Sequence, residues 1–255
     1  MAQSYYHSVR IDSRDVDANG HCKASAVLGH LQEAATQAAE HGGFGREILL
    51  KERNAFWMLT RVWYRLDRPL FWDEEITIHT WHRGGRGAVS YRDYDILSGE
   101  RIIGEGVAAW VLAEIDSRKL VKLNDLDIFQ NTSGEALCKE IKLAKIKTPA
   151  ILRELEQRTM RYSDTDINGH VNNTRYADFA CDALGMEKLE RGLFLSQMQI
   201  GYLAECYPGE NLSIFGTTVG GDNYICGKDR QGKARFEASL RFEEFKGEQE
   251  QLCLK

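Results

Sequence analysis

Residues 164–170, DTDINGH, repeat a motif that the chain already carries at residues 15–21, DVDANGH. The two copies agree at all five defined positions of the pattern D-x-D-x-N-G-H and start 149 residues apart (164 − 15 = 149). Each copy follows an extended-looking stretch, residues 5–11 in the first half and residues 159–163 in the second. Because the motif and its surroundings both recur, the sequence predicts a duplicated fold.

The hydrophobic pattern beyond each copy predicts the same order of elements. Apolar residues recur with a period near 3.6 over residues 26–38 and again over residues 176–184, and each run stops at a glycine, which predicts two helices. The period then changes to two at residues 198–202 and 236–243, which predicts strands, the last with one face in water. Residues 102–112 are apolar at both parities, as in a central strand covered on both faces.

These elements indicate an α+β fold with two domains. The polar stretch 124–148 has mixed charge and ends at Pro149, which is typical of a connector. We therefore expect an N-terminal domain over residues 1–140 and a C-terminal domain over residues 141–255. Each would have one dominant helix and four or so antiparallel strands that wrap it, and the two sheets could pair edge to edge within the chain.

Composition narrows the class of protein. The chain has 255 residues, with 33 Lys and Arg against 38 Asp and Glu, so its formal net charge is −5. That charge argues against a nucleic-acid partner, which would need a basic face. No uncharged apolar run approaches the ~20 residues of a membrane span, and no secretory segment is visible. Six cysteines lie far apart, without metal-ligand spacing. We expect a soluble cytoplasmic protein with no metal site.

Three kinds of chemistry could explain the repeated motif. D-x-D-x-N-G begins like a calcium-binding loop, but the twelfth position, which needs a bidentate glutamate, is Arg175 in one copy and Ala26 in the other. A purely structural role is reasonable, because Asp, Asn and Gly favour turns and helix caps. This role suffices for His21, and it also suits Asp164 as a turn-capping group.

A catalytic role fits the second copy. Asp166, Asn168 and His170, at alternate positions of an extended turn before a helix, could project to one side and serve acyl transfer or hydrolysis. Backbone amides at the helix start, near Val171, would hold the substrate's carbonyl oxygen. Glu205, 35 residues after His170 (205 − 170 = 35), could activate water.

The first half lacks the counterpart of this acid. The matching stretches DEEI (73–76) and GENL (209–212) lie 136 residues apart (209 − 73 = 136), and this offset pairs Glu205 with Pro69. The difference favours one active copy over two.

The second half also contains SDTDINGHVNNTRYADF followed by YLAECYPGE, and the first half contains FWMLTRVWYRLDRPLFWDEEITIHTW. These stretches resemble the acyl-acyl-carrier-protein (ACP) thioesterases of plants and bacteria, which carry D-x-N-x-H-V-N-N, a later Glu-Cys pair, and W-x-x-T-R, R-x-P-x-W-x-D and T-W in order. The resemblance implies a tandem, or double, hotdog fold in which the first half accommodates the acyl chain and the second half is catalytic.

Carried over by position, the resemblance implies a catalytic set at Asp166, Asn168, His170 and Glu205. It implies hydrolysis of fatty acyl thioesters in fatty acid biosynthesis, with acyl carrier protein as partner and no cofactor. The first half keeps Asp17, Asn19 and His21, which would form a vestigial site.

Several alternatives stay open. The chain could be an acyl-CoA thioesterase of the same fold or a non-catalytic acyl-binding hotdog module. A hotdog hydratase is disfavoured because its histidine comes one residue later.

Asp166 could attack the thioester directly or orient a water that Glu205 deprotonates. Cys206 is a less favoured nucleophile, since adjacent strand residues point to opposite faces. Arg83 and Arg86 suggest a solvated hairpin tip or a contact with the carrier. A homodimer is possible.

Overall fold

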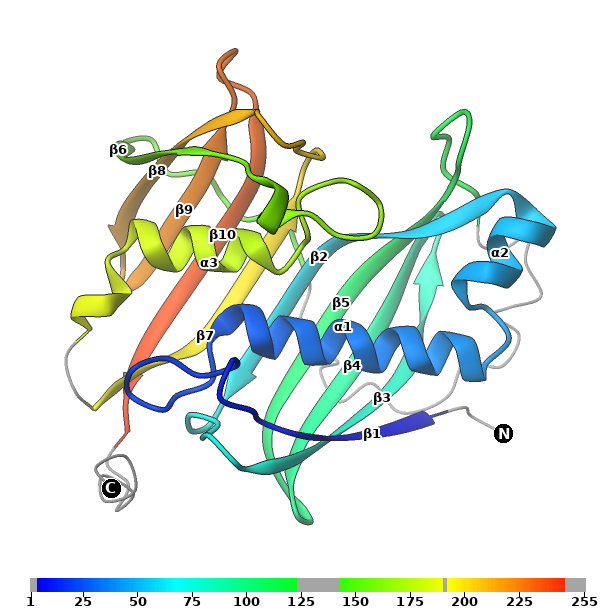
Figure 1. The fold of residues 1–255 in the computed structure, drawn as a ribbon, viewed down its shortest axis with the longest axis horizontal. Helices are drawn as coiled ribbons and strands as arrows, with labels where there is room; N and C mark the ends of the chain where they lie inside the picture. Colours follow the sequence, from blue (N-terminus) through cyan, green and yellow to red (C-terminus); the bar gives the residue numbers. More distant parts are fainter. Residues whose placement is uncertain (1–3, 123–142, 190–191, 246–255) are drawn as a thin grey trace. The chain divides into compact units, whose positions relative to one another are not determined.

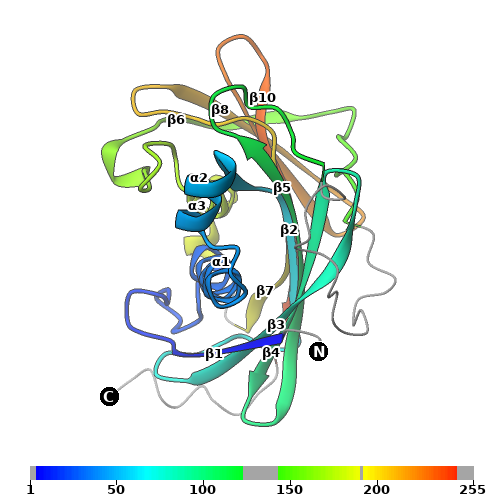
Figure 2. The same ribbon diagram turned by 90° about the vertical axis from the view of Figure 1, so that its right-hand side faces the viewer.

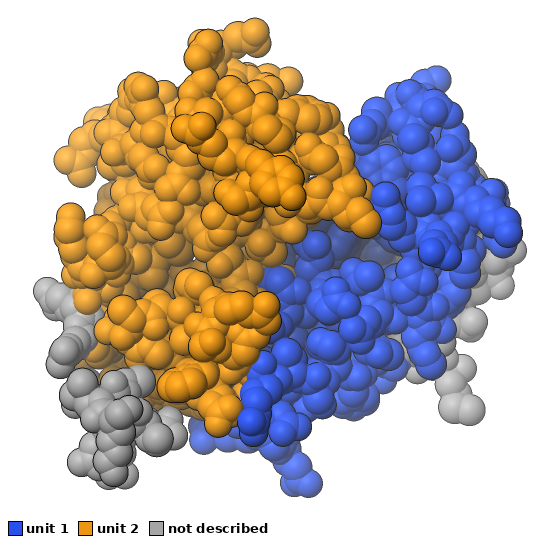
Figure 3. All heavy atoms as spheres, in the orientation of Figure 1, with its two compact units in different colours: residues 1–10, 29–64, 75–144 blue, residues 11–28, 65–74, 145–255 orange. Residues whose placement is uncertain are grey.

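The computed structural model describes residues 4–122, 143–189 and 192–245. The chain divides into two compact units (Figure 3): unit 1 comprises residues 1–10, 29–64 and 75–144, and unit 2 comprises residues 11–28, 65–74 and 145–255. Unit 2 therefore takes two short stretches from the first half of the sequence, and both copies of the repeated motif lie in it. Most of the predicted connector falls outside the described residues, and the domain boundary at residue 140 stays a prediction.

Unit 1 is built around a long helix and an antiparallel sheet (Figure 1). Strands β1, β3, β4 and β5 pair antiparallel in that order, and β2 follows β5. Helix α1 begins in unit 2 and continues into unit 1. The elements are β1 (Ser4–Arg10), α1 (Ala24–His41), α2 (Arg46–Arg53), β2 (Ala55–Leu66), β3 (Glu75–Arg86), β4 (Val89–Ser98) and β5 (Arg101–Glu114).

Helix α1 lies against the sheet, and Figure 2 shows it on the concave side of strands β3, β4 and β5. A Cβ atom at Gly106 in β5 would lie 3.6 Å from Cδ1 of Leu31 in α1, an ordinary van der Waals distance. It would lie only 3.1 Å from the carbonyl oxygen of Trp63 in β2, so glycine at this position avoids a close contact with the neighbouring strand. The predicted helix and the predicted central strand are both confirmed, since β5 is largely buried between β4 and β2.

Unit 2 repeats the arrangement with a shorter helix. Its strands pair antiparallel in the order β7-β10-β9-β8-β6. The elements are β6 (Arg153–Thr159), η3 (Tyr162–Asp164), α3 (Arg175–Ala183), η4 (Met186–Lys188), β7 (Leu193–Tyr202), β8 (Asn211–Val219), β9 (Asp222–Lys228) and β10 (Ala234–Glu244). The predicted strand over 159–163 is wrong in its position, because β6 ends at Thr159 and a 3-10 turn takes its place.

Helix α3 packs on this sheet through aromatic side chains. Tyr176 of α3 lies with its ring 5.1 Å from that of Phe236 in β10, and both side chains are buried. Strand β10 departs from the predicted pattern at Glu237, which is 2% exposed although its position was expected to face water. The expectation holds further along, at the exposed Arg241.

Each unit thus has the expected α+β architecture, a helix lying against an antiparallel sheet. In the described part of the chain, no helix is both long enough and apolar enough to cross a membrane.

Candidate active site

The second copy of the motif folds into a tight turn. The backbone N–H of Asp166 donates to the carbonyl oxygen of His170 at 3.0 Å, and that of Gly169 donates to the carbonyl oxygen of Asp166 at 3.0 Å. Gly169 has φ +77°, a left-handed conformation that glycine adopts without strain. The turn is not the extended segment that alternate spacing suggested, so the motif side chains are placed by turn geometry.

Within this turn, Asp166 and Asn168 form one pair. The backbone N–H of Asn168 donates to Oδ1 of Asp166 at 2.8 Å, and its side-chain Nδ2 lies 3.4 Å from Oδ2. Aspartate is favoured at the start of such a turn because its short carboxylate can accept the backbone N–H of the residue two positions later.

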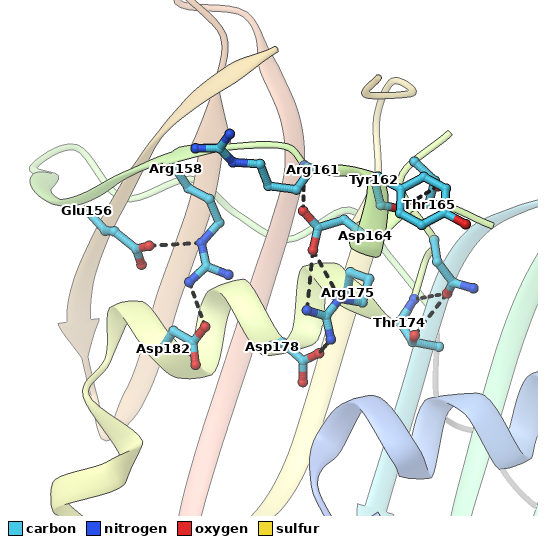
Figure 4. Close-up of polar contacts among 11 residues, drawn as sticks. Glu156, Arg158, Arg161, Tyr162, Asp164, Thr165, Thr174, Arg175, Asp178 and Asp182 are labelled. Atoms are coloured by element: carbon cyan, nitrogen blue, oxygen red, sulfur yellow. Dashed lines mark hydrogen bonds and ion pairs between the residues drawn. The ribbon is translucent and has the colours of Figure 1, made fainter. Parts of the chain in front are cut away.

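Asp164 ties the turn to helix α3 (Figure 4). Its buried carboxylate accepts the N–H of Arg161 at 2.8 Å and lies 3.3 Å from the guanidinium of Arg175, the first residue of α3. Its carbonyl oxygen accepts the N–H of Asn172 at 2.8 Å. These contacts explain Asp164 as the capping group expected from the sequence. Helix α3 begins only at Arg175, so His170 does not stand at its first turn.

The loop after β7 brings the acid to the histidine. The N–H of Val171 donates to the carbonyl oxygen of Cys206 at 2.9 Å. That N–H is therefore already engaged and is not one of the amides that could hold a substrate carbonyl oxygen, while the expectation that amides near Val171 do so stays a prediction. The same bond, however, fixes Glu205 next to the motif. Oε1 of Glu205 lies 3.8 Å from Nδ1 of His170, with the two side chains 29% and 18% exposed.

Neighbouring side chains hold this second pair. The hydroxyl of Tyr207 donates to Oε2 of Glu205 at 3.0 Å, and its ring meets that of His170 edge-on at 5.4 Å. Nη1 of Arg235 donates to the carbonyl oxygen of Glu205 at 2.7 Å, while its Nε binds Asp229 at 3.0 Å. Glu205 is thus fixed through both its backbone and its carboxylate.

The four predicted site residues therefore form two pairs, Asp166 with Asn168 and His170 with Glu205, joined by the backbone bond between Asp166 and His170. Asp166, His170 and Glu205 are partly buried, whereas Asn168 is exposed. Two carboxylates, an amide and an imidazole can together orient and deprotonate a water and donate hydrogen bonds to a carbonyl oxygen. Within the described ranges, no group of three or more His, Cys, Asp or Glu side chains could hold a metal ion.

The first copy has the same turn without the acid. The N–H of Asp17 donates to the carbonyl oxygen of His21 at 2.8 Å, and the N–H of Cys22 donates to that of Leu70 at 2.7 Å. This last bond corresponds to the one between Val171 and Cys206. The structure thus confirms the offset of 136 residues (206 − 70 = 136), and Pro69 stands where the second copy has Glu205.

Tyr207 is a site residue that the sequence analysis missed. The offset of 136 pairs it with Phe71 (207 − 71 = 136), whose ring meets that of His21 edge-on at 5.6 Å. A comparison of the two copies at that offset would have found the added hydroxyl.

Cys206 has the environment of a structural thiol. It is 0% exposed, and burial raises the pKa of the Cys206 thiol, which disfavours the thiolate that a nucleophile needs. The hydroxyl of Tyr176 shares a hydrogen bond with it. These observations weigh against cysteine catalysis.

Arg83 is not a free surface cation. Its Nε lies 2.9 Å from each carboxylate oxygen of Asp93, which is fully buried. A contact between this arginine and a carrier would have to break a buried ion pair, which is costly. The expected role of Arg83 in carrier binding is therefore disfavoured.

Comparison with known proteins gives a family. The N-terminal domain of the acyl-ACP thioesterases matches residues 2–131, and their C-terminal domain matches residues 152–251. A palmitoyl-ACP thioesterase of Arabidopsis thaliana is 28% identical over 213 residues, which are 77% of this chain and 50% of the relative. One from Gossypium hirsutum is 25% identical over 209 residues, with the same coverage. The chain spans about half the length of these relatives.

Solved structures share the fold. An acyl-ACP thioesterase from Bacteroides thetaiotaomicron has a TM-score of 0.84 at 23% identity, with 94% of this chain and 98% of that chain covered. The 12:0-ACP thioesterase from Umbellularia californica has a TM-score of 0.77 at 20% identity, with 96% and 98% covered. The expected double hotdog fold is confirmed by these likenesses. Since both halves of the sequence match the two domains in order, the chain belongs to the acyl-ACP thioesterase family.

Proposed function

We propose that this protein hydrolyses fatty acyl thioesters carried on acyl carrier protein and releases the free fatty acid during fatty acid biosynthesis. The observation that carries the proposal is the pairing of His170 with Glu205 beside the Asp166 turn, in a chain whose two halves match the two thioesterase domains. The cytoplasmic location and the possible homodimer stay predictions.

The proposed reaction uses water as the nucleophile. Glu205 accepts a proton from the water, whose oxygen bonds to the thioester carbonyl carbon. The carbon–sulfur bond then breaks, and the thiol leaves with the proton that Glu205 returns, so the products are a fatty acid and the free carrier thiol. His170 and Asn168 donate hydrogen bonds to the carbonyl oxygen as it gains negative charge, and Asp166 holds Asn168 in place.

Thiol release from purified acyl-ACP tests the proposal. The wild-type protein should release one thiol per fatty acid formed. Glu205→Gln should lower kcat by ~100-fold or more, since a lost general base typically costs 10²–10⁴-fold. His170→Ala and Asp166→Asn should each lower kcat by ~100-fold or more, because the first removes a donor to the carbonyl oxygen and the second releases the donor Asn168. Unchanged thermal unfolding would show that the variants are folded. No thiol release from any acyl-ACP by the wild type, together with tight retention of the acyl ligand, would instead favour a binding module.

The carrier is tested with matched substrates. We expect kcat/KM for acyl-ACP to exceed that for the acyl-CoA of the same chain length, because the chain matches acyl-ACP thioesterases in both domains. Equal or higher kcat/KM for acyl-CoA would favour the acyl-CoA thioesterase.

A further inference from the structure

The carboxylate of Glu205 lies between two partners. Its Oε1 is 3.8 Å from Nδ1 of His170, and its Oε2 accepts the hydroxyl of Tyr207 at 3.0 Å. The Tyr207 side chain is 44% exposed, so packing of the ring does not by itself hold the hydroxyl at the acid. The hydrogen bond selects which carboxylate oxygen faces the histidine.

The duplicated loop supplies an internal comparison. The N–H of Tyr207 donates to Oε2 of Glu210 at 3.0 Å, and the N–H of Phe71 donates to Oε2 of Glu74 at 3.1 Å. Each ring meets the histidine of its own copy at a similar angle, 77° for Tyr207 with His170 and 75° for Phe71 with His21. The two loops are therefore built alike, down to the ring on the histidine.

The loop sequences differ between the copies at seven of eight positions, since residues 203–210 and 67–74 share only their final glutamate at the offset of 136. Two of these differences bear on the acid: where the second copy has Glu205 and Tyr207, the first copy has Pro69 and Phe71. A phenylalanine in the first copy satisfies the ring contact with His21, so the ring contact alone does not call for a hydroxyl. In the second copy the hydroxyl donates to the carboxylate of Glu205, which suits an electrostatic role.

We propose that Tyr207 is a positioning residue, whose hydroxyl holds Glu205 with one carboxylate oxygen toward His170 and the active-site water. This inference rests on the proposed function and names a further residue of the same site. Fixing the carboxylate removes rotamers in which the base points away from the reacting water.

The test is the variant Tyr207→Phe, which removes one oxygen and keeps the ring. We expect kcat to fall by about five- to tenfold with KM changed less than about twofold, because the base is mispositioned in the bound complex. Thermal unfolding of the variant should match that of the wild type. A merely structural role would lower the unfolding temperature together with kcat.

Two controls make the result specific. In a Glu205→Gln background, Tyr207→Phe should have little further effect, because the side chain that Tyr207 positions no longer acts as a base. Phe71→Tyr adds the hydroxyl to the first copy, where Pro69 stands in place of Glu205, and should leave kcat unchanged.

The outcomes separate this inference from the proposed function. A wild-type protein without thioesterase activity would overturn the proposed function. An active wild type, with Glu205→Gln inactive but Tyr207→Phe unchanged in kcat, would overturn the role of Tyr207 alone. A loss of kcat in Tyr207→Phe that is additive with Glu205→Gln would also overturn it.

Discussion

At the scale of single residues, the two acids of the site have different surroundings. Oδ1 of Asp166 accepts the Asn168 backbone N–H at 2.8 Å, and Oδ2 lies 3.4 Å from the Asn168 side-chain amide, so both oxygens face donors. Donors on both oxygens reduce the nucleophilicity of a carboxylate. Glu205 faces an imidazole, which suits proton transfer. The geometry thus favours the water route over a direct attack by Asp166.

Single turnover in heavy-oxygen water checks this preference. We expect solvent oxygen in the released fatty acid, with no acyl adduct on the quenched protein and no heavy oxygen in the peptide that contains Asp166, because water attacks the thioester directly. Intact-protein and peptide mass spectrometry would measure both. An acyl adduct that forms and decays at the rate of turnover would establish the covalent route instead.

At the scale of elements, the β3–β4 hairpin holds a half-buried histidine. Nε2 of His82 lies 2.7 Å from Oγ of Ser90, and Arg92 is its partner in the strand register. Burial, and to a lesser extent the charge of Arg92, lowers the pKa of His82 to about 4. A histidine in the unfolded chain has a pKa near 6.5. Below that pH, His82 is therefore protonated in the unfolded chain but still neutral in the folded hairpin, which favours unfolding. The stability contributed by His82 is therefore present above pH ~6.5 and lost as the pH falls toward about 4.

Urea unfolding at two pH values tests this linkage. Between pH ~7 and ~5, the free energy of unfolding of the wild type should fall by up to about 2 kcal/mol more than that of His82→Gln, which cannot titrate. The difference between the two proteins removes the contribution of the other acids and histidines. Parallel pH dependence in wild type and variant would contradict the expected linkage.

At the scale of the whole molecule, one chain carries two copies of the turn but one complete site. In the first copy, Oδ1 of Asp17 accepts the backbone N–H of Asn19 at 2.8 Å and that of His21 at 3.0 Å. These hydrogen bonds stabilise the turn. Burial lowers the pKa of His21, and the neighbouring acid position is occupied by Pro69. The turn is therefore kept in both copies, while Glu205, the proposed general base, is present in only one of them.

Matched substitutions in the two copies measure this asymmetry. Asp17→Asn and His21→Ala should each leave kcat/KM within about twofold, because no base completes that copy, whereas Asp166→Asn and His170→Ala should lower it by ~100-fold or more. Thermal unfolding of all four variants controls for lost structure. A large loss of kcat/KM in the first-copy variants, with folding intact, would mean that the first copy takes part in the reaction.

The repeat, the α+β class and the residues of the second copy could be predicted from the sequence, because turn chemistry and hydrophobic periodicity are local properties of the chain. The offset that pairs Glu205 with Pro69 was also readable from sequence, since the two loops have equal lengths. These features can be predicted without knowing which residues, distant in the sequence, are in contact in the fold.

The hydrogen-bond and ion-pair partners of the site residues depend on the tertiary structure. The Val171 N–H binds Cys206, Arg83 pairs with buried Asp93, and the Tyr207 hydroxyl reaches Glu205. Each of these contacts depends on where a hydrogen-bonding group points once the chain is folded, and spacing along the sequence does not fix that direction. The buried Glu237 likewise departs from a simple alternation because its burial depends on what covers that face of β10.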